Sequence, residues 1–381
     1  MGGASAVLAG AVSTLLGTCG PFMDVAADAF CPFVLEIFYL GITTGTTAAT
    51  YDPTANVNRL QMAAFLSRTV DGALKRGGRR AALDQFWTAQ SAGVLGITTG
   101  VGLGPALVAA DGADIWVAAY TDGVVTRVRA SDGKLLGTWI DADNAWGVLP
   151  AMGRIFVSAS LLFGPGALYR IDPSQPPGSV AAVATNLGNA PQALTFDGAR
   201  IWTANYVTPG SVSIVTPGAS LPWTVTNVTS GFISPVGAIY DGANVWVTDK
   251  NQGRLFKLDA AGAVIKEVIV GTDPRYPAFD GGNIWVPNHV SNSVSVVRAS
   301  SGAILVTLTG NGLNHPAAVA FDGQRILVTN GDTDTVSLFK AADLTAAGTF
   351  STGAGSLPWG ACSDGVNFWI AFQGTASLGR F

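Results

Sequence analysis

The stretch ALTFDGARIWTANY (193–206) decides the fold, because six variants of it recur along the chain. Each copy holds two short apolar runs separated by a turn, usually Asp-Gly, with a large apolar residue at the centre of the second run. These central residues follow one another in steps of 40, 46, 44, 39, 42 and 42, and they are Trp116, Phe156, Trp202, Trp246, Trp285, Leu327 and Trp369. Strand-like segments that repeat about every 42 residues are typical of a β-propeller with one blade per repeat. The sequence therefore predicts an all-β fold, a seven-bladed β-propeller with its tryptophans packed between blades.

Each repeat has room for four strands. After the central run come a polar loop and two further strand-like segments, as in RLFKLDAAGAVIKEVIV (254–270). The Asp-Gly pairs supply the positive-φ turn between the first two strands. The seventh repeat ends after its third strand, SLGRF (377–381), so we expect DQFWTAQ (84–90) to add the missing strand and close the ring.

The composition agrees with a β-rich fold. The chain has 381 residues, of which 48 are glycine and only 12% are charged, and it contains two glutamates. Helical surfaces are rich in Glu and Lys, so this composition favours strands joined by Gly, Asn and Asp turns. The formal net charge is −4 and no basic stripe runs along the chain, which argues against nucleic-acid binding.

The first 81 residues differ from the propeller at 82–381. Residues 1–20 are an apolar segment, too short to span a bilayer and similar to the core of an export signal. Residues 21–76 have helical patterns, and 77–81 form a Gly- and Arg-containing linker. Cys19 and Cys31 flank a compact part of this region, so we expect a local disulfide in an exported protein.

The segment PFMDVAADAFCPFVLEIFYLGITTGTTAATYDPTANVNRLQMAAFLSR (21–68) resembles a single S-layer homology motif. The resemblance lies in the F-x-D-V start, a helix ending in L-G-I-T-T-G, the Y-D-P turn and a second helix over 56–70. In that family three motifs assemble into a unit that holds cell-wall polysaccharide. Arg59 matches the arginine of the family's Thr-Arg-Ala-Glu signature, whereas the acidic position is Gln61. The resemblance implies wall binding through Arg59.

The repeats, with their D-G-x-x-I-W-V-x-N form, resemble the YVTN-type and streptogramin-lyase-like propellers over about three quarters of the chain. The lyases of that family use two histidines one blade apart, with a glutamate beside one of them. One blade before His289 stands Lys250 and one blade after it stands Gly331, and neither glutamate falls in a loop at that end. The resemblance therefore implies the fold, and the lyase constellation is not carried over.

Candidate chemistry lies in the loops at one mouth of the central channel. His289 and His315 fall in such loops on neighbouring blades. Two imidazoles with a carboxylate such as Asp249 or Asp273 would suit acid–base catalysis or a metal, whereas the alternative is a rim of hydrogen-bonding loop residues. The same loops carry the binding candidates, whose aromatic members would stack on sugar rings: Lys250, Arg275, Tyr276, Asn288, Trp146 and Trp359.

Metal sites have weaker signals. Asp332 and Asp334 form an oxygen-rich turn that would suit calcium, but the EF-hand pattern is absent. No Cys/His cluster supports structural zinc. We therefore expect no cofactor, with calcium at this turn as the alternative.

Two functions remain open. The first is an exported, cell-surface protein without a transmembrane span, acting as a non-catalytic scaffold or binding module for a polysaccharide or protein. The second is a lyase or hydrolase with its site around His289 and His315. The lone N-terminal motif leaves apolar side chains uncovered, so we expect it either to dock onto its own propeller or to associate with other copies.

Overall fold

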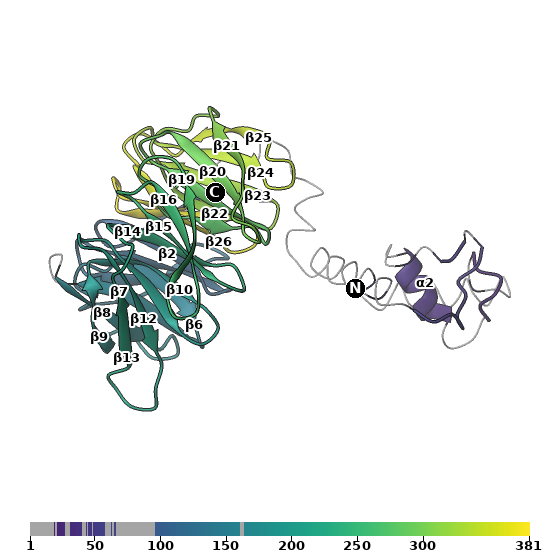
Figure 1. Cartoon of the computed structure of the whole chain (residues 1–381), viewed down its shortest axis with the longest axis horizontal. Helices are drawn as coiled ribbons and strands as arrows, with labels where there is room; N and C mark the ends of the chain where they lie inside the picture. The colour runs from purple at the N-terminus through teal and green to yellow at the C-terminus, as the bar shows by residue number, and fades with distance from the viewer. Residues whose placement is uncertain are drawn as a thin grey trace. The chain divides into compact units, whose positions relative to one another are not determined.

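The computed structural model describes residues 19, 21–26, 31–39, 43, 45–47, 49–57, 62, 65, 96–160 and 164–381. The chain divides into two compact units, Met1–Trp87 and Thr88–Phe381 (Figure 1). Among the described residues, no helix is long and apolar enough to cross a membrane.

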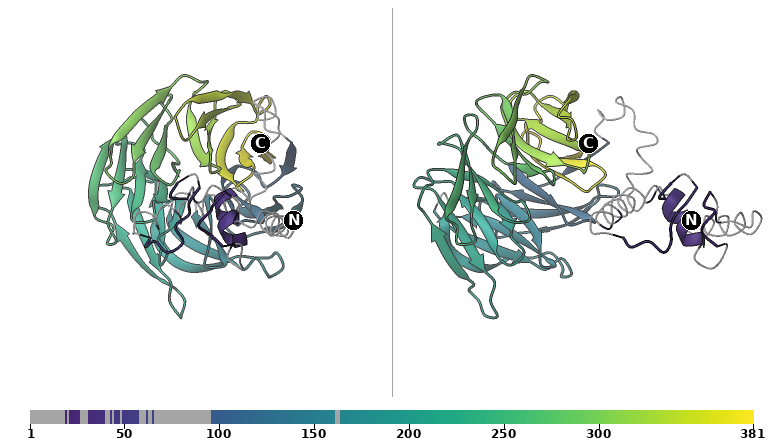
Figure 2. Two further views of the ribbon diagram at one scale, coloured as in Figure 1. Left: turned by 90° about the vertical axis from the view of Figure 1, so that its right-hand side faces the viewer. Right: turned by 45° about the vertical axis from the view of Figure 1, so that its right-hand side comes forward.

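The second unit contains, within its described residues, seven antiparallel sheets of four strands each, one for each sequence repeat (Figures 1 and 2). Blades 1 to 3 are β2–β5 (Pro105–Ala110, Asp114–Ala119, Val124–Arg129, Leu135–Trp139), β6–β9 (Gly147–Ala151, Arg154–Ser160, Pro165–Ile171, Ala181–Asn189) and β10–β13 (Pro191–Phe196, Ile201–Asn205, Ser211–Thr216, Thr224–Val228). Blades 4 to 6 are β14–β17 (Pro235–Tyr240, Val245–Asp249, Arg254–Leu258, Val264–Ile269), β18–β21 (Ala278–Phe279, Asn283–Asn288, Ser293–Arg298, Ile304–Thr309) and β22–β25 (Pro316–Phe321, Arg325–Asn330, Thr335–Lys340, Ala346–Ser351). Blade 7 combines β26–β28 (Pro358–Ser363, Phe368–Phe372, Ser377–Arg380) with β1 (Ile97–Gly100), and β26 lies beside β2 of blade 1. The predicted seven-bladed propeller is confirmed.

The ring closes as expected in principle, but with a different strand. β1 pairs with β28 in an antiparallel register that sets Thr99 opposite Leu378. The prediction that 84–90 supplies this strand is wrong, and that segment lies outside the described residues. The fourth strand of blade 7 must end close to the start of β2, and 97–100 reaches it through only four residues, 101–104.

The Asp-Gly turns have a second function that the repeat pattern did not reveal. In five blades the aspartate Oδ2 accepts the indole N–H of the tryptophan five residues later, at 2.7–2.9 Å. The pairs are Asp111–Trp116, Asp197–Trp202, Asp241–Trp246, Asp280–Trp285 and Asp364–Trp369. These indoles are at most 1% exposed, so each aspartate satisfies a buried donor that would otherwise be unpaired.

The first unit is described in part. Its helix α2 (Cys31–Tyr39) lies where the sequence predicts the first helix, and Cys19 is joined to Cys31 by a disulfide, with Cα atoms 5.4 Å apart. Both cysteines are buried in a small core with Phe22 and Leu35. Most of the second expected helix, including Arg59, lies outside the described residues.

Candidate functional site

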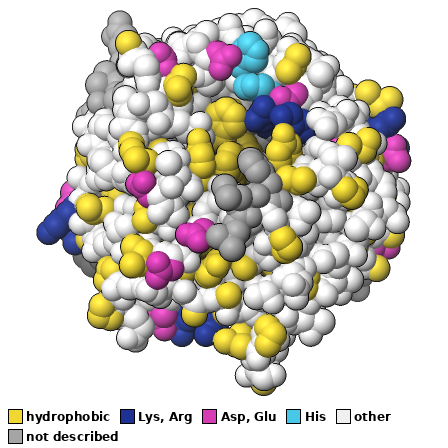
Figure 3. All heavy atoms as spheres, turned by 90° about the vertical axis from the view of Figure 1, so that its left-hand side faces the viewer, with side chains coloured by type: hydrophobic (Ala, Val, Ile, Leu, Met, Phe, Trp, Pro, Cys, Tyr) yellow, Lys and Arg dark blue, Asp and Glu magenta, His cyan; other side chains and the backbone are white. Residues whose placement is uncertain are grey.

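The two histidines lie side by side on one face of the propeller, the face formed by loops between second and third strands and between blades (Figure 3). His289 directly follows β19 and His315 directly precedes β22. Their ring centroids are 4.9 Å apart at an interplanar angle of 65°. The structure thus brings together the two imidazoles that the sequence placed on neighbouring blades.

Carboxylates and an arginine surround this pair. His315 Nδ1 is 2.7 Å from Asn314 Oδ1 and 3.1 Å from Asp332 Oδ2. Asp273 accepts the His289 backbone N–H through its carbonyl oxygen, and its carboxylate forms an ion pair with Arg275 at 2.8 Å. Burial and the nearby Arg275 guanidinium lower the pKa of His289 below its ordinary value, so this imidazole is neutral at pH 7. The predicted carboxylate Asp273 therefore belongs to the histidine cluster, together with Asp332.

A hydrogen-bonded chain of side chains spans the central channel. The Tyr276 hydroxyl accepts the indole N–H of Trp146 at 2.8 Å and donates to Gln192 Oε1 at 2.8 Å. Trp146 and Gln192 come from the neighbouring blades 2 and 3, whereas Tyr276 comes from the start of blade 5, which reaches them only across the middle of the ring. Burial raises the pKa of Tyr276 to about 12. Tyr276 therefore fixes the neighbouring groups, and its phenol is not open to a ligand.

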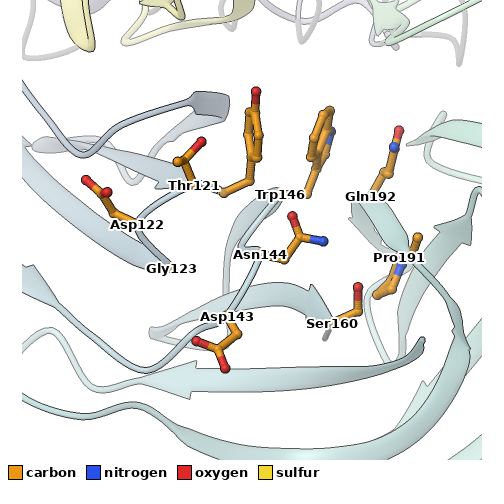
Figure 4. Close-up of a pocket in the computed structure, with 11 residues that line it drawn as sticks. Thr121, Asp122, Gly123, Asp143, Asn144, Trp146, Ser160, Pro191 and Gln192 are labelled. Carbon is orange, nitrogen blue, oxygen red and sulfur yellow. The ribbon is translucent and has the colours of Figure 1, made fainter. Parts of the chain in front are cut away.

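A pocket of about 500 Å³ opens beside this chain, between blades 1, 2 and 3 (Figure 4). Tyr120 and Trp146 form one wall, with ring centroids 4.9 Å apart and an interplanar angle of 31°. The rest of the lining is mostly polar and consists of Thr121, Asp122, Gly123, Asp143, Asn144, Ser160, Ala190, Pro191 and Gln192. Of these residues, sequence reasoning named Trp146 alone as a binding candidate.

Trp359, the other tryptophan candidate, belongs to the histidine cluster. Its ring centroid lies 6.0 Å from that of His289, and the Arg275 guanidinium lies over the indole at 5.0 Å. Arg275 is thus held between an ion pair and an aromatic face.

Asp249 and Asn288 have structural contacts. Both are fully buried, at the last position of the second strand of their blades. Asp249 accepts two backbone N–H groups of the loop that leads into β14. The Asn288 amide donates to Ser293 and Ser295 of the next strand, as Asn205 does to two serines in blade 3. Neither side chain is free for the catalytic or binding role predicted for it, because the polar groups are used inside the blade.

The remaining candidates lie elsewhere on the loops. The Lys250 ammonium lies 5.2 Å from the ring centroid of Tyr206. Asp334 accepts the backbone N–H groups of Gly355 and Leu357, and these bonds lower the pKa of its carboxyl. Asp332 contacts His315 instead, so the two aspartates do not share a ligand role. Among the residues that the structure describes, no group of three or more His, Cys, Asp or Glu side chains could hold a metal ion.

The position of a residue relative to the central residue of its repeat explains which candidates are buried and which lie at the site. The residue three positions after the central residue of each repeat is buried, as Asp249 and Asn288 are, whereas the next residue is partly exposed in five of the seven repeats. That next position is occupied by Tyr120, Ser160 and His289, which line the pocket or form the histidine cluster. The position four residues after the central residue was therefore the signal that could have found Tyr120 and Ser160.

No protein-family model matches the chain, and no curated protein matches it. Among solved structures, virginiamycin B lyase from Staphylococcus aureus has a TM-score of 0.62 at 14% identity, covering 74% of this chain and 98% of that one. A streptogramin B lyase has a TM-score of 0.60 at 15% identity, covering 74% and 96%. The WD40 propeller domain of Doa1 has a TM-score of 0.62 at 13% identity, covering 75% and 95%. At these identities the likeness shows the fold alone, a seven-bladed β-propeller like that of the streptogramin B lyases.

Proposed function

We propose that the chain is an exported, cell-surface binding module whose propeller holds a polysaccharide in the pocket beside Trp146, without catalysing a reaction. The observation that carries this proposal is the aromatic wall formed by Tyr120 and Trp146 among amide, hydroxyl and carboxylate side chains. A sugar ring has apolar C–H faces and a rim of hydroxyl groups, so it is complementary to such a combination.

The wall is held in place before any ligand arrives. Trp146 is half-buried, and its indole N–H is fixed by the Tyr276 hydroxyl. Gln192 is bound to the same hydroxyl. A site with fixed side chains loses little conformational entropy on binding, which supports recognition of a weakly interacting polymer.

The charge of the pocket favours some polymers over others. Asp122 and Asp143 line it, and its described lining contains no lysine or arginine. Glycans rich in phosphate or uronate groups would meet like charge there. The proposal is therefore specific to neutral polysaccharides.

The cell-surface location has separate support. The Cys19–Cys31 disulfide suits an oxidising compartment. The resemblance to an S-layer homology motif, with Arg59 in the wall-binding position, favours attachment to a cell wall. Fractionation of native cells, followed by detection of the chain in the wall fraction, tests this part of the proposal.

The binding experiment is a titration with neutral cell-wall oligosaccharides. Trp146→Ala should weaken binding by about 30-fold, since central aromatic residues commonly contribute about 2 kcal/mol. Trp359→Ala is the matched control, because this half-buried tryptophan lies on the same face but outside the pocket. Equal effects of the two substitutions, in variants that stay folded, would refute the pocket as the site. Absence of glycan binding by the natural chain would favour a protein partner.

The convergence of the imidazoles favours a second candidate, a lyase or hydrolase at His289 and His315. Their 4.9 Å separation and the contact of His315 with Asp332 are compatible with an acid–base pair. The test is an assay for turnover of a substrate by the natural chain. Loss of that turnover in His289→Ala and His315→Ala, together with its retention in Trp146→Ala, would support the enzyme and contradict the binding module.

A further inference from the structure

We infer that His289 and His315 form a binding site for one late first-row transition-metal ion, of which Zn²⁺ is the reference case. The inference goes beyond the proposed function and uses other residues than the glycan pocket. It depends on the geometry of the two rings, on the hydrogen bonds that orient them and on the charges around them.

The ring separation fits a shared ion. Two imidazoles that bind one ion through nitrogens at 2.0–2.1 Å, with an angle of about 90–110° between them, have ring centroids about 4.5–5.2 Å apart. The observed separation of 4.9 Å lies within that range. The rings come from two different blades, so a rigid sheet supports each of them and the separation is set by the ring of blades.

Hydrogen bonds orient His315 as they do a ligand. An oxygen of Asn314 and an oxygen of Asp332 both face Nδ1, so this nitrogen carries the proton. Nε2 then has the free lone pair. A carboxylate that accepts the N–H of a metal-binding imidazole is the usual outer partner in such sites, where it fixes the ring and raises its basicity.

His289 supplies an independent observation. Its Nδ1 atom is buried and has no hydrogen-bond partner among the described residues. Buried polar atoms without partners are rare in folded proteins and are commonly explained by an ion or water. An ion beside this ring would give the nitrogen its missing partner.

The local charges permit a cation. Arg275 is the nearby positive charge, and its ion pair with Asp273 at 2.8 Å offsets it. The Asp332 side chain is 60% exposed and adds a negative charge next to His315, whose own side chain is 37% exposed. The side of the site formed by His315 and Asp332 is thus open to solvent, and water from that side would complete the coordination of the ion.

The donor set selects the metal. Imidazole nitrogens suit Zn²⁺, Ni²⁺ and Cu²⁺, whereas Mg²⁺ and Ca²⁺ prefer oxygen ligands.

The two proposed ligands are the two histidines of the sequence, so substitution of both leaves no histidine that could bind the ion. Tag-free full-length protein is titrated with Zn²⁺ by calorimetry and with Co²⁺ by visible absorption. We expect one ion per chain, no competition from Mg²⁺ or Ca²⁺, and loss of binding in His289→Phe and in His315→Phe. Asp332→Asn should weaken binding about 10- to 100-fold, whereas Asp343→Asn, which removes the same charge from an exposed turn, should not.

A second measurement is made on the natural chain, so its result does not depend on whether the variants fold. Both imidazoles of the natural chain are followed by ¹H–¹⁵N NMR during the Zn²⁺ titration, and we expect both to shift together and saturate at one equivalent. Failure of Zn²⁺ to bind, binding that survives the substitution of both histidines, or a shift of one ring alone would overturn the inference. None of these results affects the glycan pocket, and loss of glycan binding would leave the metal site intact.

Discussion

The aspartate–tryptophan bond of the repeat is the contact whose strength is most directly testable. In blade 5, Asp280 Oδ1 accepts the backbone N–H groups of Gly282 and Asn283, and Oδ2 accepts the indole N–H of Trp285 at 2.7 Å. Trp285 is fully buried. Asp280→Ala removes three hydrogen bonds of the turn, two from backbone N–H groups and one from the Asn283 side-chain amide, and also leaves the buried indole N–H without its acceptor.

The magnitude follows from these contacts. A buried donor without a partner costs about 1–3 kcal/mol, and each lost turn hydrogen bond costs about 1 kcal/mol. We therefore expect Asp280→Ala to lower the free energy of unfolding by about 4–6 kcal/mol. Asp259 is the matched control, because its carboxylate accepts two backbone N–H groups but no indole. Asp259→Ala should cost about 2 kcal/mol.

Urea denaturation measures both values. The difference between the two variants reports the indole bond and the Asn283 amide bond together, and it should be about 2–4 kcal/mol. Trp285→Phe keeps an aromatic ring but removes the N–H, so Asp280→Ala should cost less in that background than in the natural chain. Equal losses in Asp280→Ala and Asp259→Ala, or strict additivity with Trp285→Phe, would refute the reasoning.

Four further outcomes are expected. Burial raises the pKa of Asp111, but the Trp116 indole and two backbone N–H groups outweigh it, so the pKa is lower than usual. A lowered folded-state pKa stabilises the protein above the unfolded value of about 3.9, so urea midpoints should stay level near pH 7 and fall below about pH 4. Thiol counting in denaturant without reductant should find only Cys362, and three thiols would contradict the disulfide. Leu378→Ala, in β28 opposite Thr99 of the closing strand β1, should cost about 2–5 kcal/mol, and the half-exposed Leu135→Ala far less; similar losses would argue against closure by β1. Light scattering should find a monomer, and an oligomer that dissociates on removal of residues 1–80 would contradict this.

The fold could be predicted from the sequence because each blade carries its own copy of the pattern. The period, the Asp-Gly turns and the buried tryptophans are local features, and they were sufficient for seven blades. The closing strand was misplaced because 97–100 belongs to no repeat, and its choice depends on the distance to β2. The indole bonds were visible only as a constant spacing of five residues between Asp and Trp.

The site was predictable only in part. The meeting of His289 with His315 follows from adjacent loops on adjacent blades, which the repeat register fixes. Asp249 and Asn288 were mistaken for exposed residues, because the sequence does not distinguish a buried polar residue at the end of a strand from an exposed one. The pocket depends on Trp146, Tyr120 and Gln192 from three blades, and no single repeat contains that arrangement. The packing of side chains across the ring therefore decides where the pocket forms.

The most direct test of the central claim is an experimental structure of the chain with a bound neutral oligosaccharide. The proposal predicts one sugar ring against the Trp146 and Tyr120 side chains, with its hydroxyl groups within hydrogen-bond distance of residues such as Asn144 or Gln192. A sugar bound outside this pocket, or a pocket that stays empty while the oligosaccharide binds at the histidine cluster, would contradict it.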